Sequence, residues 1–286
     1  MVVGCGWIGC GGADGRFRPP RRARKFGAAA IRASHTPRES IAVRAFTPLA
    51  LVCSVPFECE RLRDALADAR EIAVGRKPAW TGRLDGAGVV LLPGGMGKTN
   101  AAHALTALLE TTDVRGVIGF GIGGAYPGSG LDVGGIALAT QAVYGDEGVQ
   151  APGGWMSTEG IGIPLWQAGG ARTFNTFALD APRVERARAA LAAAGHAVRT
   201  GPFVTVSCCS GTAALGAEMA ARFPGALCEG MEGAALAHVA AIYGVPYLEL
   251  RAVSNLVEDR DLSRWRIADA ARAAQAAVRV VAGAWE

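Results

Sequence analysis

The chain has 286 residues, of which 50% are hydrophobic and 19% charged, so it can form a substantial core and is not a wholly disordered chain. Its net charge of +4 is unevenly divided: residues 1–45 hold nine basic and two acidic side chains, which leaves residues 46–286 with a net charge of −3. A body of net negative charge is a poor nucleic-acid binder, and no apolar run reaches the ~18 residues of a membrane span. We therefore expect neither nucleic acid nor a membrane as a partner.

Residues 1–45 are interpreted as a basic, disordered extension, and residues 46–286 as the only domain. The run RFRPPRRARK (16–25) has no apolar periodicity, and the start of the chain lacks the long apolar stretch of a secretory signal. The alternative is an upstream stretch read through because the true start lies later. The seven cysteines form no CxxC motif and the histidines no metal-ligand pattern, so we expect no metal, reduced thiols and a cytoplasmic location.

Beyond residue 46, short apolar runs alternate with segments of helical periodicity. Buried strands are predicted over residues 48–55, 88–94, 114–124, 135–144, 201–207 and 245–254. Helices are predicted over residues 57–69, 99–110, 182–195, 212–222, 232–243 and 266–282. The intervening residues 145–172, rich in Gly, Pro and Trp, are predicted to be a long loop. This order predicts a single α/β domain, a three-layer sandwich whose mostly parallel or mixed central sheet is covered on both faces.

Glycine-rich segments follow two of the predicted strands. GGMGKT (94–99) opens a helix, so its N–H groups can bind an anion or a sugar hydroxyl. It is not a P-loop, because Leu92 stands where that motif requires glycine. GFGIGG (119–124) matches GxGxxG, but turn residues follow it instead of a helix. We interpret this second segment, which includes Gly123, as a turn where the backbone approaches a ligand.

Several polar residues stand at predicted strand ends or helix starts, where catalytic groups often lie in α/β proteins. Glu58 follows the first core strand and is either a helix N-terminal acid or a general base. Glu232 opens an Ala-rich helix and either complements the helix dipole or binds a sugar diol, with Met231 on the apolar face of that sugar. Arg251 and Asn255 end a strand, and Asn255 fits a turn or helix cap as well as a catalyst.

Together these segments resemble the nucleoside phosphorylase and nucleosidase superfamily. The resemblance covers about residues 47–284 and rests on these segments, in the family's order: Glu58 after a strand, GGMGK (94–98), GIGGAYPGSGLDVG (121–134), GMEGAALAHV (230–239) and RAVSN (251–255). The closest branch is similar to the methylthioadenosine/S-adenosylhomocysteine nucleosidases. Within it, GAYPGSG, MEG and RAVSN resemble the futalosine hydrolases of a menaquinone pathway.

The resemblance implies a nucleoside phosphorylase-like fold and a role for each matching residue. Glu58 matches the base that activates water, and Met231 and Glu232 match the pair that holds the ribose. Asn255 matches the group that contacts the purine leaving base, and Arg251 matches an arginine that supports the site.

A further residue, Phe203, is expected to stack on the base. The chain departs from the adenosine-cleaving relatives at Gly230, where they carry an acid, and in the loop Cys208, Cys209 and Ser210. It also carries Asn255 where those relatives have Asp. An Asn amide can donate to the 6-keto oxygen and N7 of hypoxanthine, whereas a carboxylate would face the keto group unpaired. Asn255 therefore predicts a 6-oxopurine nucleoside as the substrate.

The function expected from this resemblance is hydrolysis of the N-glycosidic bond of futalosine, with release of hypoxanthine and no metal or organic cofactor. The alternatives are a methylthioadenosine/S-adenosylhomocysteine or aminodeoxyfutalosine nucleosidase, a phosphorylase with Lys98 at an anion site, and a non-catalytic nucleoside-binding protein. A homo-oligomer is expected by resemblance. Trp155 and Trp166 are candidates either to cover the carboxyphenyl group of futalosine or to pack in a loop or subunit contact.

Overall fold

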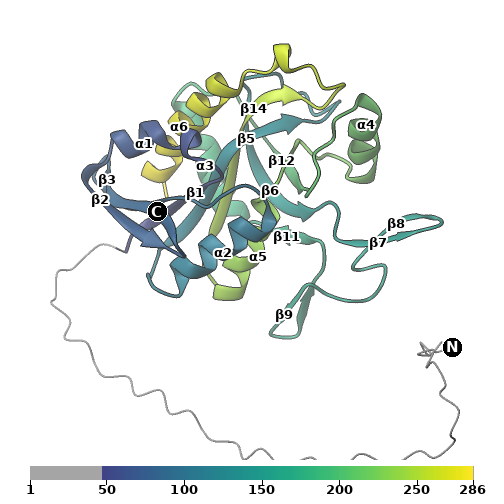
Figure 1. Ribbon diagram of the computed structural model, residues 1–286, viewed down its shortest axis with the longest axis horizontal. Helices are drawn as coiled ribbons and strands as arrows, with labels where there is room; N and C mark the ends of the chain where they lie inside the picture. The colour runs from purple at the N-terminus through teal and green to yellow at the C-terminus, as the bar shows by residue number, and fades with distance from the viewer. Residues whose placement is uncertain (1–46, 286) are drawn as a thin grey trace, which may run out of the picture. The chain divides into compact units, whose positions relative to one another are not determined.

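A mixed sheet of ten strands forms the centre of the protein (Figure 1). Its strands are β1 (Leu49–Cys53), β2 (Ala67–Val74), β3 (Lys77–Leu84), β4 (Ala87–Pro93), β5 (Gly116–Ala125), β6 (Ile136–Tyr144), β11 (Thr176–Ala178), β12 (Val198–Thr205), β13 (Cys228–Gly230) and β14 (Tyr247–Leu256). The strand order is β11–β6–β12–β13–β5–β1–β4–β3–β2, and β14 pairs with both β5 and β6. The computed structural model describes residues 47–285, so the predicted extension at 1–45 lies outside the described residues.

Both faces of this sheet are covered by helices, because its central strands are apolar on both sides. The helices are α1 (Glu60–Asp64), α2 (Lys98–Leu109), α3 (Ala181–Ala193), α4 (Ala213–Arg222), α5 (Gly233–Tyr243) and α6 (Ile267–Gly283). On β1, Leu49 and Leu51 pack in the cluster that contains residues of α1, α3 and α6. Ala50 and Val52 pack in the cluster that contains residues of α2 and α5. The predicted three-layer α/β sandwich with a mixed sheet is thus confirmed (Figure 1).

The prediction of a helix over residues 57–69 is wrong for most of that segment. A 3-10 helix (Pro56–Glu58) and the short α1 take its place, and β2 already begins at Ala67. β2 forms an antiparallel hairpin with β3 that we did not predict. The reason is that most residues of β2 are exposed, so the strand has no apolar alternation to indicate it.

Two other segments also differ from the prediction. The glycines of GFGIGG lie inside β5 rather than in a turn, since β5 is paired with β1, β13 and β14. Residues 145–172 are not only loop: they contain the hairpin of β7 (Gly148–Ala151) and β8 (Gly154–Ser157), and the strand β9 (Trp166–Ala168), which pairs with β10 (Ala171–Thr173).

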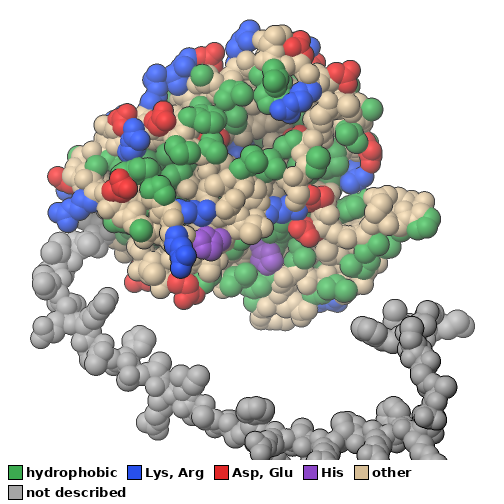
Figure 2. All heavy atoms as spheres, viewed as in Figure 1, with side chains coloured by type: hydrophobic (Ala, Val, Ile, Leu, Met, Phe, Trp, Pro, Cys, Tyr) green, Lys and Arg blue, Asp and Glu red, His purple; other side chains and the backbone are tan. Residues whose placement is uncertain are grey.

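No single charge dominates the face of the described part that Figure 2 shows. On the face shown in Figure 2, Lys and Arg side chains lie among Asp and Glu side chains rather than in one continuous area. None of the helices within residues 47–285 has the length and hydrophobicity needed to cross a bilayer.

Candidate active site

A cavity of about 470 Å³ opens where β1, β5, β13 and β14 carry the predicted site residues. Six of the seven residues predicted for the site line it: Glu58, Gly123, Met231, Glu232, Arg251 and Asn255. The seventh, Phe203, does not: its side chain is buried in a cluster with Ala139, Leu227 and Val253. The structure therefore does not support base stacking by Phe203, because this side chain faces the core from β12.

Glu58 is held in a fixed orientation in the short 3-10 helix that follows β1. Its Oε2 accepts hydrogen bonds from the backbone N–H groups of Ser54 (3.0 Å) and Val55 (3.2 Å), and its Oε1 accepts one from Ile122 (2.9 Å). A Cβ atom on Gly121 would lie 2.5 Å from Oε1, so this glycine makes room for the carboxylate. Burial raises the pKa of Glu58, while the charge of Arg251 and the backbone hydrogen bonds partly offset that rise. An oriented, buried carboxylate of raised pKa is suited to accept a proton from water.

Arg251 connects the acidic groups of the site. Its Nε donates to Oε1 of Glu249 (3.0 Å), its Nη2 to Oε2 of Glu232 (3.3 Å) and its Nη1 to the carbonyl oxygen of Ile122 (3.1 Å). Burial alone would lower the pKa of Arg251, but the carboxylates of Glu249 and Glu232 raise it above its ordinary value. Arg251 therefore stays charged and fixes Glu232, which agrees with the supporting role implied by the resemblance.

Glu232 lies at the N-terminus of α5 and also lines the cavity, so both of its predicted interpretations are compatible with its position. Its Oε1 accepts a hydrogen bond from the N–H of Gly97 (2.9 Å), which has a φ of 89°. The glycine loop thus donates to a protein carboxylate here. The neighbouring Lys98 forms ion pairs with Asp146 and Glu147, so its charge is already compensated.

The amide of Asn255 has a defined orientation. Its Oδ1 accepts a hydrogen bond from Oγ of Ser254 (2.7 Å), and its Nδ2 donates to the carbonyl oxygen of Leu256 (3.0 Å). A carbonyl oxygen can only accept, so the NH₂ group must lie on that side. One N–H of Nδ2 is left for a ligand in the cavity that Asn255 lines.

Other residues of the cavity were missed by the sequence analysis. They include Phe57, Met96, Glu229, Arg260 and Trp265, together with Cys209 and Ser210 of the loop in which the chain departs from the adenosine-cleaving relatives. The Arg260 guanidinium lies over the Trp265 ring at 4.6 Å from its centroid. Both belong to the polar segment between β14 and α6, where no periodicity indicates which side chains face a site.

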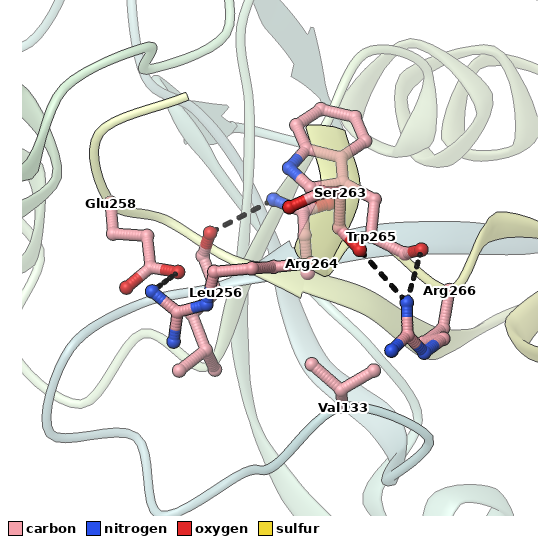
Figure 3. A pocket seen from close by; sticks show the side chains of 8 residues that line it. Val133, Leu256, Glu258, Ser263, Arg264, Trp265 and Arg266 are labelled. Atoms are coloured by element: carbon pink, nitrogen blue, oxygen red, sulfur yellow. Dashed lines mark hydrogen bonds and ion pairs between the residues drawn. The ribbon is translucent and has the colours of Figure 1, made fainter. Parts of the chain in front are cut away.

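A smaller cavity of about 230 Å³ lies next to the site (Figure 3). Asn255 and Trp265 line both cavities. In Figure 3, Arg266 donates to the carbonyl oxygens of Ser263 (3.0 Å) and Trp265 (3.3 Å). These bonds fix the backbone that carries the Trp265 ring.

The two tryptophans proposed to cover the substrate do not line the site. Trp155 packs edge-on against Phe223, with ring centroids 5.8 Å apart. Trp166 packs against the cluster between the sheet and helices α2 and α5. Of the two interpretations given above, the structure supports packing, and Trp265 is the tryptophan at the cavity.

The fold and the carboxylates at this cavity define a class of proteins. The chain belongs to it, because a family model described as "Phosphorylase superfamily" matches residues 48–284. Among named relatives, the chain is 38% identical over 205 residues to a futalosine hydrolase of Thermus thermophilus, covering 70% of this chain and 84% of the relative. It is 36% identical over 193 residues to a futalosine hydrolase of Streptomyces coelicolor, covering 66% of this chain and 76% of the relative.

Nucleosidases are also similar to the chain. A 5'-methylthioadenosine/S-adenosylhomocysteine nucleosidase of Anoxybacillus flavithermus is 31% identical over 214 residues, which cover 73% of this chain and 85% of the relative. The crystal structure of the Neisseria meningitidis enzyme of the same name, in complex with methylthio-immucillin-A, matches with a TM-score of 0.72 at 26% identity, covering 82% of this chain and 98% of that one. The predicted superfamily is confirmed, and these names support the prediction of an N-glycosidase.

Proposed function

We propose that this protein hydrolyses the N-glycosidic bond of futalosine and releases hypoxanthine and dehypoxanthine futalosine. The observation that carries the proposal is the amide of Asn255, whose orientation leaves an N–H donor at the cavity. Hypoxanthine presents two acceptors, O6 and N7, on the edge that this donor would meet. The futalosine hydrolases among the relatives support the same substrate.

In the proposed reaction, Glu58 takes a proton from a water molecule whose oxygen bonds to C1′ as the bond from C1′ to the purine breaks. The transition state resembles an oxocarbenium ion. Glu232, held by Arg251 and Gly97, binds the ribose hydroxyls and favours positive charge in the ring. Asn255 stabilises the negative charge that develops on the leaving purine. The purine then takes up a proton from solvent, and Glu58 releases to solvent the proton that it took from water.

Water suits this cavity better than phosphate as the attacking group. Three carboxylates, those of Glu58, Glu229 and Glu232, line it, and a phosphate beside them would be repelled. The charge of Arg251 is compensated by Glu249 and Glu232, which leaves Arg260 as the single uncompensated cation beside three carboxylates among the described residues that line the cavity. We expect equal rates of purine release with and without phosphate, measured by chromatography of the free base, and release only with phosphate would contradict hydrolysis.

The Arg260–Trp265 pair provides a place for the carboxyphenyl group at the 5′ end of futalosine. Arg260 makes no ion pair or hydrogen bond with any other residue between 47 and 285 that would occupy its guanidinium. A guanidinium stacked on an indole can bind a carboxylate while the indole contacts the attached ring. We expect Arg260→Ala to raise KM for futalosine about tenfold, equivalent to ~1.4 kcal/mol, and to leave inosine hydrolysis unchanged.

Steady-state kinetics on both substrates check this expectation. Arg264→Ala is a matched control, because Arg264 belongs to the same segment but pairs with Glu258 (2.7 Å) in the neighbouring cavity. An equal loss on futalosine and inosine in Arg260→Ala would contradict recognition of the carboxylate.

The pH dependence of the activity should reflect the ionisation of Glu58. A general base works when deprotonated, so activity is lost as the pH falls through its pKa. Because burial raises the pKa of Glu58, the loss should occur above the pH range of an ordinary glutamate. A profile of kcat/KM against pH tests this, since it reports groups of the free enzyme. A rate that stays constant down to the range of an exposed glutamate would contradict the assignment.

A further inference from the structure

Asn255, Gly124 and Glu229 form a row across three neighbouring strands at the cavity. In the sheet register, Asn255 of β14 is paired with Gly124 of β5, and Glu229 of β13 is paired with the same Gly124. All three residues line the cavity. Adjacent strands lie about 4.8 Å apart, so the two polar side chains flank a residue that has none.

Because Gly124 has no side chain, the side chains of Asn255 and Glu229 can both lie close to it. A Cβ atom on Gly124 would lie 3.3 Å from Nδ2 of Asn255 and 3.7 Å from Cγ of Glu229. It would also lie 3.0 Å from Cγ2 of Val257, so even a single added carbon atom would be crowded at this position. A flat ring edge placed over Gly124 would therefore meet Asn255 on one side and Glu229 on the other.

Glu229 brings hydrogen-bond acceptors to the cavity that it lines. It is 4% exposed, and its Oε2 accepts from Oγ of Ser210 (2.9 Å) and the hydroxyl of Tyr126 (3.1 Å). Its Oε1 accepts a single bond, from the N–H of Ser210 (2.8 Å). A carboxylate oxygen has two lone pairs, so Oε1 keeps one acceptor position. The mechanism above gives this buried carboxylate no role.

We propose that Glu229 is a specificity-determining residue that accepts a hydrogen bond from N1–H of a 6-oxopurine. Asn255 donates a hydrogen bond to the edge of the same base that carries O6 and N7. This inference rests on the proposed function and adds the residue that recognises N1–H of the base. In a 6-aminopurine the pattern is reversed, because N1 is an acceptor and the 6-amino group a donor. The N1 lone pair would then face Glu229, and the amino group would face the N–H of Asn255.

The test compares futalosine with its 1-deaza analogue, in which a C–H replaces N1–H. In the wild-type protein, kcat/KM should be at least about tenfold lower for the analogue, because a buried acceptor loses its partner. In Glu229→Gln this ratio should fall toward one. A role of Glu229 confined to holding the Ser210 loop would lower both rates equally and leave the ratio unchanged, which would overturn the inference.

Two further measurements complete the test. Calorimetric titration with free hypoxanthine should show weaker binding to Glu229→Gln and to Gly124→Ala, whose added Cβ would lie 3.3 Å from Nδ2 of Asn255 and displace the amide. Glu218→Gln, an exposed glutamate on α4, should bind like the wild type. If the wild type hydrolyses futalosine and its 1-deaza analogue with nearly equal kcat/KM, the role of Glu229 is overturned and the proposed function is not. No release of hypoxanthine by the wild type would overturn the proposed function and this inference together.

Discussion

Replacing Glu58 with Gln is expected to lower kcat for hypoxanthine release by about 10²–10⁴-fold, the usual contribution of a general base. The amide keeps the shape of the side chain but cannot take the proton of the attacking water. Binding of the nucleoside should change little, since Glu232, Met231 and Asn255 are left in place. Single-turnover assays measure the chemical step, and calorimetry with a 6-oxopurine nucleoside measures binding.

Two comparisons separate this loss from misfolding. Glu60→Gln changes an exposed glutamate two residues further along the chain and should retain wild-type turnover. In the variant, the NH₂ group replaces one carboxylate oxygen and faces at least one of the three N–H groups that donate to Glu58, so the melting temperature should be measured as well. A folded Glu58→Gln protein that binds the nucleoside and turns over like the wild type would show that Glu58 is not the base.

Asn255→Asp is expected to shift the preference between 6-oxopurine and 6-aminopurine nucleosides by about 100-fold or more in favour of the amino substrate. The carboxylate would place oxygen atoms opposite O6 of hypoxanthine and opposite the carbonyl oxygen of Leu256, which now accepts from Nδ2. The clash with the Leu256 carbonyl affects both substrates and cancels in this ratio. The shift comes from the base: the oxo substrate gains an unpaired O6, at about 1–3 kcal/mol, and the amino substrate gains a hydrogen bond to the carboxylate, at about 1 kcal/mol or more.

The ratio of kcat/KM for futalosine and its 6-amino analogue measures this shift. Asn100→Asp, an exposed change on α2 beside Lys77, is the control and should leave the ratio unchanged. If Asn255→Asp lowers both rates equally, Asn255 does not read the 6-position of the base.

The layered fold was predictable because the central strands carry apolar residues on both faces and alternate with helices. Glu58 and Asn255 could be found for a similar reason: Glu58 follows β1, Asn255 lies next to the end of β14, and such ends meet at one edge of the sheet. Arg251 lies in the middle of β14, because this strand continues beyond its predicted end. The β2–β3 hairpin could not be predicted, since β2 is mostly exposed and its sequence shows no strand periodicity.

The remaining site residues depend on which face of an element they occupy, and that is decided by tertiary packing. Phe203 lies on a strand whose neighbours are also buried, so its sequence does not show that the side chain points into the core. Glu229 and Glu249 lie in apolar strands, and only the sheet register places Glu229 beside Gly124. Glu249 could be recognised as a partner of Arg251 only once their side chains were seen together.

The measurement that tests the central proposal most directly is purine release from futalosine, its 6-amino analogue, methylthioadenosine and inosine, each with and without phosphate. We expect hypoxanthine from futalosine at the highest kcat/KM and at the same rate in both buffers. Faster release of adenine from methylthioadenosine would contradict the substrate proposed here and the role of Asn255, and release that requires phosphate would contradict hydrolysis.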